Sequence, residues 1–253
     1  MRRFFMTCLA LSIAFVSYAQ KAVDFHFNPE IGKTLSFHTI SKTDIDGAQS
    51  MIMNMDMQID VLPSKKEDDN FTLENEIKAV KVDMNVGMMT LSYDSEEGGT
   101  DETSKMIGDQ FSKIIDKKIT SVISGKGKTI DLALPDDMAV QGLDPSTFSN
   151  MSPSLPEKAV VPGESWKSTI EMAENPVFSQ MDMTSTYREE TAEGYIIDVQ
   201  GKMINAEGQE SGTISGYYTL DKKTHFTKAS KLQTKLEVEG TKISSDMEMT
   251  LAK

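Results

Sequence analysis

The residues in this chain whose type and spacing could do chemistry are its methionines. In the stretch Met51–Val61 every odd position is apolar, and four of those six residues are methionine. The even positions from 54 to 60 are Asn, Asp, Gln and Asp. A period of two predicts a β-strand with one apolar face and one polar face. We therefore expect the four methionines to point to the same side of a sheet.

Several roles fit such a row of thioethers. Methionine fills irregular cores, and it also lines adaptable surfaces that bind apolar ligands. Thioethers bind Cu(I) as well, but side chains two apart on a strand stand roughly 6–7 Å apart, so a copper site needs ligands from several strands. No cysteine or histidine cluster accompanies the row. An oxidation sink requires exposed methionines, whereas strict alternation favours buried ones.

Residues for other chemistry are sparse. The three histidines, His26, His38 and His225, lack the paired spacing of a metal site. The Asp-Ile-Asp-Gly segment at 44–47 resembles the start of a calcium loop but lacks the further oxygen ligands, so a hairpin turn is the better interpretation. The chain has no Gly-x-Ser-x-Gly elbow, and no carboxylate pair stands out. We therefore predict no catalytic residues, no metal and no cofactor, and an enzyme is the less favoured class.

The N-terminus has the features of a signal peptide. Two arginines precede an almost unbroken apolar run, Phe4–Val16, and Ser17-Tyr18-Ala19 forms a small-x-small cleavage site. The run is too short for a spanning helix, and no other stretch reaches the length that spanning needs. We expect cleavage between Ala19 and Gln20, which removes residues 1–19 and leaves an exported chain in the periplasm or outside the cell.

The charge balance is strongly acidic. The formal net charge is −13, and removal of the two arginines in residues 1–19 changes it to 24 − 39 = −15. A chain this acidic is repelled by phosphate backbones and anionic headgroups, which disfavours nucleic acid as a partner. The single cysteine, Cys8, lies in the signal peptide, so the mature chain has no disulfide and depends on its hydrophobic core.

Alternation and turn signals predict a mainly β, antiparallel fold. One amphipathic helix is expected at about 103–117, with Asp101 or Thr103 as its N-cap. A charged turn is expected at 63–70, and a phase slip at Ala79-Val80 predicts a β-bulge. The expected strands are 34–42, 51–61, 71–88, a short strand around Leu91 and Tyr93, the region 119–134, and then 165–172, 180–188, 195–204, 212–220, 226–238 and 242–251.

Two motifs indicate an internal repeat. Met55-Asp56-Met57 is echoed by Met181-Asp182-Met183, and Gly32–Leu35 corresponds loosely to Gly163–Trp166. We therefore expect two similar β-rich halves, 20–134 and 156–253, joined by a linker at 135–155. Their long strands would form curved sheets, arranged either as a half-barrel or as a sandwich.

Two segments carry a resemblance to a known family. Asn28–Thr34 opens the mature chain, and Leu155–Trp166 opens the second half with a Pro-Gly-Glu-Ser-Trp turn. Together with the methionine-rich strands, they resemble a family of uncharacterised exported proteins from Bacteroidetes-type bacteria. That resemblance implies no activity and no catalytic residues. The overall plan is similar to that of periplasmic lipoprotein carriers, whose curved sheet and helix enclose a lipid chain, although similarity of fold is weak support for function.

The leading hypothesis is an exported, non-enzymatic binding protein with a methionine-lined apolar groove for a lipid or other hydrophobic ligand. The alternative is a structural or protein-interaction module of the cell envelope, whose apolar face is a closed, packed core without a ligand. A continuous cavity would favour the first hypothesis. The candidate lining residues are Met51, Met53, Met55, Met57, Met181, Met183, Met247, Met249 and Trp166.

Overall fold

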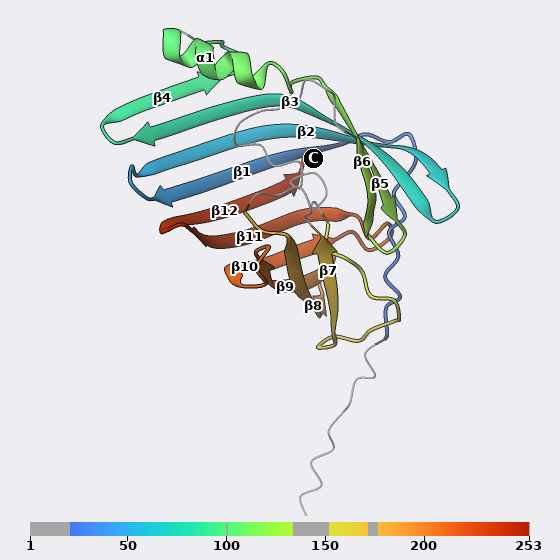
Figure 1. The fold of residues 1–253 in the computed structure, drawn as a ribbon. Helices are drawn as coiled ribbons and strands as arrows, with labels where there is room; N and C mark the ends of the chain where they lie inside the picture. Colours follow the sequence, from blue (N-terminus) through green and yellow to red (C-terminus); the bar gives the residue numbers. More distant parts are fainter. Residues whose placement is uncertain (1–20, 100, 134–151, 172–176, 253) are drawn as a thin grey trace, which may run out of the picture.

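The computed structural model describes residues 21–99, 101–133, 152–171 and 177–252 (Figure 1). The predicted signal peptide and most of the predicted linker lie outside these residues. The described chain forms twelve strands and one helix. The elements are β1 (Leu35–Asp46), β2 (Met51–Glu67), β3 (Asn70–Val86), β4 (Met89–Asp94), α1 (Glu102–Phe111), β5 (Lys118–Ser124), β6 (Thr129–Ala133), β7 (Ser165–Glu171), β8 (Gln180–Glu190), β9 (Tyr195–Ile204), β10 (Glu210–Leu220), β11 (Thr227–Val238) and β12 (Thr241–Leu251).

The strands form one curved antiparallel sheet, which confirms the mainly β prediction in its half-barrel form (Figure 1). The strand order is β6-β5-β3-β2-β1-β12-β11-β10-β9-β8-β7. The long strand β3 pairs with β5 along its first part and with β4 along its last part. Because β1 pairs with β12 at the centre, both halves of the chain share one sheet and one core.

The two halves begin with the same kind of turn. Gly32 (φ 82°) and Gly163 (φ 94°) both adopt the left-handed backbone conformation, which favours glycine. In each turn the residue after the glycine donates its N–H to the carbonyl three positions back, at 3.3 Å in the first turn and 3.0 Å in the second. The turns that lead into Gly32–Leu35 and Gly163–Trp166, which the sequence pairs as a repeat, therefore share a glycine conformation and a hydrogen bond.

The helix is shorter than predicted. Asp101 is its N-cap, with one carboxylate oxygen accepting the N–H groups of Thr103 and Ser104, each at 2.9 Å. The expected end at 117 is wrong, because α1 stops at Phe111. Ile115 instead forms a β-bridge with Ile77 of β3, so the last predicted turns pack against the sheet.

Two other boundaries differ in detail. The predicted turn at 63–70 is wrong in its length, because β2 continues to Glu67 and only Asp68 and Asp69 separate it from β3. The predicted bulge occurs one residue earlier than expected: Gln58 pairs with Ala79 while Ile59 pairs with Ile77. The extra residue is therefore Lys78. The region expected as strand at 119–134 is a hairpin, β5–β6.

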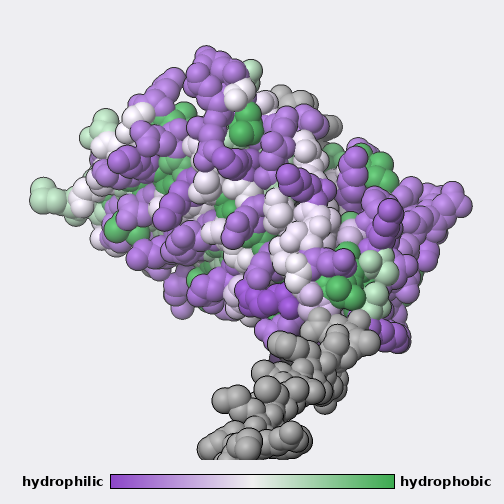
Figure 2. Space-filling model, turned by 90° about the horizontal axis from the view of Figure 1, so that it is seen from below, coloured by the Kyte–Doolittle hydropathy of each residue, from purple (hydrophilic) through white to green (hydrophobic). Residues whose placement is uncertain are grey.

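The sheet curves around an aromatic cluster at one end. Phe27, from the segment before β1, contacts Phe71 of β3 and Phe226 beside β11, with ring centroids 5.4 Å and 5.2 Å apart. The strands β3 and β11 are separated by three others in the sheet, so one side chain reaches both only because the sheet bends. We call the side of the sheet that faces this core the inner face. Seen from below, much of the surface of the molecule is hydrophilic, with scattered hydrophobic patches (Figure 2).

Candidate functional site

The strand register places all nine candidate lining residues on the inner face. In an antiparallel sheet directly paired residues share a face. Met57 and Met249 both pair with Thr39, and Met55 and Met247 both pair with Ser41. These rows of directly paired residues continue across β11, β10 and β9 to β8 and β7. The remaining candidates on this face are Met51, Met53, Met181, Met183 and Trp166.

Burial changes along the strands of this face. Met57 and Met249 are 5% and 4% exposed, and Met55 and Met181 are also buried. Met51, Met53, Met183, Met247 and Trp166 are only half-buried. On one and the same strand, some methionines are therefore packed and others are partly open to solvent.

The two ends of the inner face differ in composition. We call the buried cluster of Phe25, Phe27, Phe37, Phe71 and Phe226 the aromatic end. We call the half-buried group of Met51, Met53, Met84, Met183 and Met247 the methionine end. In Figure 1 the segment that precedes β1 lies on the right, and the β1–β2 hairpin tip lies on the left.

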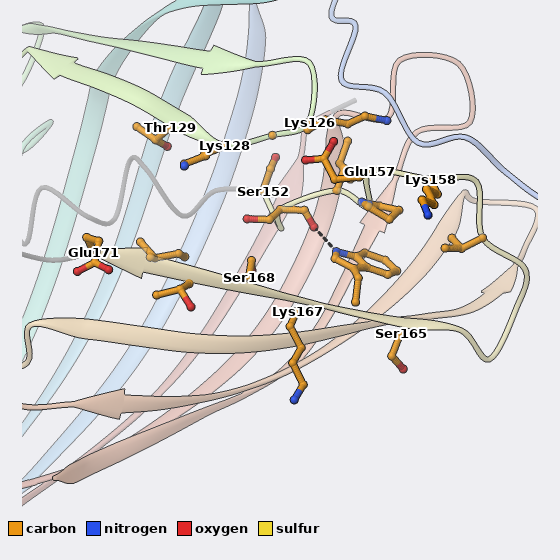
Figure 3. Close-up of a pocket in the computed structure, with 18 residues that line it drawn as sticks. Lys126, Lys128, Thr129, Ser152, Glu157, Lys158, Ser165, Lys167, Ser168 and Glu171 are labelled. Atoms are coloured by element: carbon orange, nitrogen blue, oxygen red, sulfur yellow. Dashed lines mark hydrogen bonds between the residues drawn. The ribbon is translucent and has the colours of Figure 1, made fainter. Parts of the chain in front are cut away.

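A cavity of about 710 Å³ lies between the two edge strands of the sheet, β6 and β7 (Figure 3). It is bounded by the β5–β6 turn, by β7 and by the segment 152–160, with Leu155, Pro156, Val160, Trp166 and Ile170 as its apolar residues. Ligand pockets of about 300–1,000 Å³ are typical for small molecules. We call this space the seam cavity.

Hydrogen bonds fix the walls of the seam cavity. The Trp166 indole N–H donates to the Ser154 carbonyl at 2.7 Å (Figure 3), and the Leu155 N–H donates to the Lys126 carbonyl at 2.8 Å. The Lys126 ammonium donates to the Phe25 carbonyl at 2.9 Å and pairs with Asp24 at 3.1 Å. These contacts tie β7, the segment 152–160 and the β5–β6 turn together, so the cavity is a formed feature of the fold.

The seam cavity borders the methionine-bearing face. A small neighbouring cavity of about 30 Å³ shares Ser152, Ser154, Ser168 and Ile170 with it. The other side of that small cavity is formed by Met181, Met183, Val199, Ile214 and Tyr218. Of the candidate residues, Trp166 lines the seam cavity itself, whereas Met181 and Met183 lie at its inner boundary.

Burial shifts the pKa values of three side chains packed beneath the inner face. Burial raises the pKa of Tyr218 far above its usual value and raises the pKa of Tyr187 to about 12. Burial lowers the pKa of His225, although the hydrogen bond between its Nδ1 and the His26 backbone acts in the opposite direction. The lining of the seam cavity, by contrast, includes the charged side chains of Lys126, Lys128, Glu157, Lys158, Lys167 and Glu171 (Figure 3).

The other candidate chemistries find no support in the described residues. No group of three or more His, Cys, Asp or Glu side chains in that part of the chain could hold a metal ion. His38 lies on the outer face, 2.6 Å from Asp56, and His26 is 2.9 Å from Asp69. Within the same residues, no helix has the length and apolar character needed to cross a membrane.

The sequence matches no protein-family profile and none of the curated proteins compared with it. Its fold is similar to part of lipovitellin, in a structure whose subject is lipid–protein interactions in that protein. The TM-score is 0.54, the sequence identity is 11%, and the match covers 91% of this chain. It covers 26% of the lipovitellin chain, so this chain spans about a quarter of that length. At this identity the likeness shows a shared fold.

Proposed function

We propose that this chain is an exported, non-enzymatic binding protein that holds a lipid or other hydrophobic ligand against the inner face of its sheet. The observation that carries the proposal is the half-burial of the methionine end, of which Met183 lines the small cavity beside the seam cavity of about 710 Å³. A closed core would bury these side chains as completely as it buries Phe37 or Met57. The fold shared with lipovitellin, whose structure concerns lipid–protein interactions, agrees with this proposal.

Methionine suits this role because its side chain is unbranched and polarisable. It adapts to ligands of varied shape, whereas a branched or aromatic residue fixes one shape. The packing of the aromatic end holds the strands of the sheet in place. These strands carry the methionine end and border the seam cavity. The proposed site therefore combines a rigid support with an adaptable lining.

The proposal can be tested with diphenylhexatriene, a hydrocarbon probe that fluoresces in apolar surroundings. The wild-type protein should bind the probe saturably, and Met53→Asp should abolish binding while the protein stays folded by circular dichroism. Met53 is half-buried on the inner face, so a carboxylate there reaches solvent but makes the lining polar.

The matched control is Asn54→Asp, which adds the same charge one residue away on the exposed outer face. It should bind the probe like the wild-type protein. Absence of saturable binding by the wild-type protein would contradict the proposal, and would favour the packed-core alternative.

A further inference from the structure

A column of hydroxyl side chains runs along β1 between two columns of methionines. Thr39, Ser41 and Thr43 all face inward from this strand, since they pair with inner-face residues on both sides. On β2 their partners are Met57, Met55 and Met53. On β12 their partners are Met249, Met247 and Ser245. The centre of the inner face therefore carries hydrogen-bonding groups in an otherwise apolar surface.

Among the described residues, the hydroxyl of Thr39 has no hydrogen-bond partner. Thr39 is 3% exposed, and its buried Oγ1 forms no hydrogen bond within the described part of the chain. By contrast, the Thr43 Oγ1 lies 3.0 Å from the Ser245 hydroxyl. A buried hydroxyl without a partner is costly, and native proteins retain few of them. This position is therefore suited to a partner that arrives with a ligand.

The surroundings of Thr39 are uncharged. On β2 and β12, the inner-face residues that pair with β1 between Phe37 and Ile45 are all apolar or carry a hydroxyl group. A carboxylate buried there would lack a cation, which makes its desolvation strongly unfavourable. A neutral carbonyl oxygen accepts a hydrogen bond without that cost.

We propose that Thr39 donates a hydrogen bond to a neutral carbonyl oxygen of the ligand, which makes the ligand an acyl ester rather than a free fatty acid or a hydrocarbon. This inference rests on the proposed function. The half-buried Met53 and Met247 lie between the partly open end of the face and Thr39, and their unbranched side chains can shift to admit an acyl chain. The inference adds a polar contact at depth on a face that is otherwise mostly apolar.

The test compares Thr39→Val with Thr43→Val in the full protein. Valine matches threonine in shape and removes only the hydroxyl. Thr43→Val is the matched control, because it makes the same change on the same face of the same strand, where the hydroxyl already has a partner. In each protein, bound diphenylhexatriene is titrated with methyl palmitate and, separately, with palmitate at a pH where palmitate is ionised. The measured quantity is the concentration of each compound that displaces the probe.

The wild-type protein should release the probe at lower concentrations of methyl palmitate than of palmitate. Displacement of the probe from Thr39→Val should need about five-fold more methyl palmitate than displacement from the wild-type protein, which is the loss of affinity expected for one neutral hydrogen bond. The affinity of this variant for the probe should stay unchanged. Thr39→Val should also raise the unfolding temperature of the ligand-free protein. Thr43→Val should compete like the wild-type protein.

Two results would overturn this inference while leaving the proposed function intact. One is unchanged displacement of the probe from Thr39→Val by methyl palmitate. The other is displacement by palmitate at concentrations as low as those of the ester. Failure of the wild-type protein to bind the probe at all would instead remove the proposed function, and this inference with it.

Discussion

The aromatic end and the methionine end occupy the same face of the same sheet, yet they are packed differently. At the aromatic end Phe27 is 1% exposed and contacts Phe71 and Phe226 through their rings. At the methionine end Met53 and Met247 are only half-buried. Rigid rings bury a large area and fix one arrangement, whereas methionine tolerates several.

This difference in packing indicates that the aromatic end supports the stability of the fold, whereas the methionine end is suited to binding. The aromatic end joins the N-terminal segment, β3 and the start of β11 into one cluster, so it supplies much of the packing that holds the sheet in its curved form. The methionine end can then stay incompletely packed without loss of the fold. Sites of function are often drawn from the less stable parts of a structure.

The largest expected difference between the two ends concerns stability. Phe27→Ala should lower the free energy of unfolding by about 3–5 kcal/mol, because it leaves a cavity among packed rings. Met53→Ala should lower it by no more than about 1 kcal/mol, since its side chain is only partly removed from water. Urea denaturation followed by circular dichroism measures both values, and equal losses would contradict the division into two ends.

A second comparison uses two glycines in the interior of strands. A Cβ at Gly216 would lie 2.0 Å from the Lys231 carbonyl oxygen, and its φ of 151° disfavours other residues, so Gly216→Ala should destabilise the protein by roughly 1–3 kcal/mol.

A Cβ at Gly201 would instead meet the Met183 sulfur at 2.2 Å and the Ile214 Cγ2 at 2.9 Å. The half-buried Met183 can move, but the branched Ile214 side chain and the Asp182 carbonyl oxygen at 3.1 Å can move less, so Gly201→Ala should destabilise the protein by about 1 kcal/mol. It should also weaken probe binding by narrowing the space beside Met183. Denaturation midpoints and probe titrations distinguish the two variants, and an unaltered probe affinity in Gly201→Ala would place the ligand elsewhere.

The smallest expected effect is a pH dependence that arises from His225, whose ring centroid lies 5.2 Å from that of Phe25 in the aromatic end. The pKa of His225 is lowered in the folded protein, chiefly by burial, so protonation favours the unfolded chain. Stability should therefore be complete above the unfolded value of about 6.5 and should fall as the pH drops below it.

The control for this effect is His225→Asn, because asparagine tolerates the left-handed backbone at this position (φ 53°). Thermal unfolding between about pH 7 and pH 5 should show a smaller decline in this variant than in the wild-type protein. The affinity for a neutral ligand should stay constant over that range, since the methionine end carries no titratable side chain. A shared pH dependence of stability and affinity would contradict the separation of the two ends.

Local sequence patterns predicted the strands well. Strict alternation in Met51–Val61 fixed both the strand and the common face of its methionines, because side chains alternate across a sheet. The N-cap at Asp101 was also predictable from its residue type. The helix end was not, because Ile115 pairs with β3, and that contact is formed in tertiary structure.

The site was only partly predictable. The pairing of β1 with β12 joins residues about 200 positions apart, and no local pattern specifies such a contact. The segment 152–160, which bounds the seam cavity, has no periodicity that indicates its place.

The hydroxyl column was missed for a different reason. In β1 the inward residue Thr39 is buried, whereas the outward Ile40 is 49% exposed. Here the polar residue faces the core and the apolar residue faces solvent. Hydrophobic alternation therefore gives the wrong phase for this part of the strand.

The account is tested most directly by the methyl groups of the methionines themselves. With methyl-labelled methionine, and signals assigned by single Met→Leu substitutions, nuclear magnetic resonance can follow each methionine while methyl palmitate is added. The account predicts that the signals of Met51, Met53, Met183 and Met247 shift saturably. It also predicts that Met106, which is 66% exposed on α1, is unaffected. Shifts limited to exposed methionines such as Met106, or no saturable shifts at all, would contradict a lipid site on the inner face.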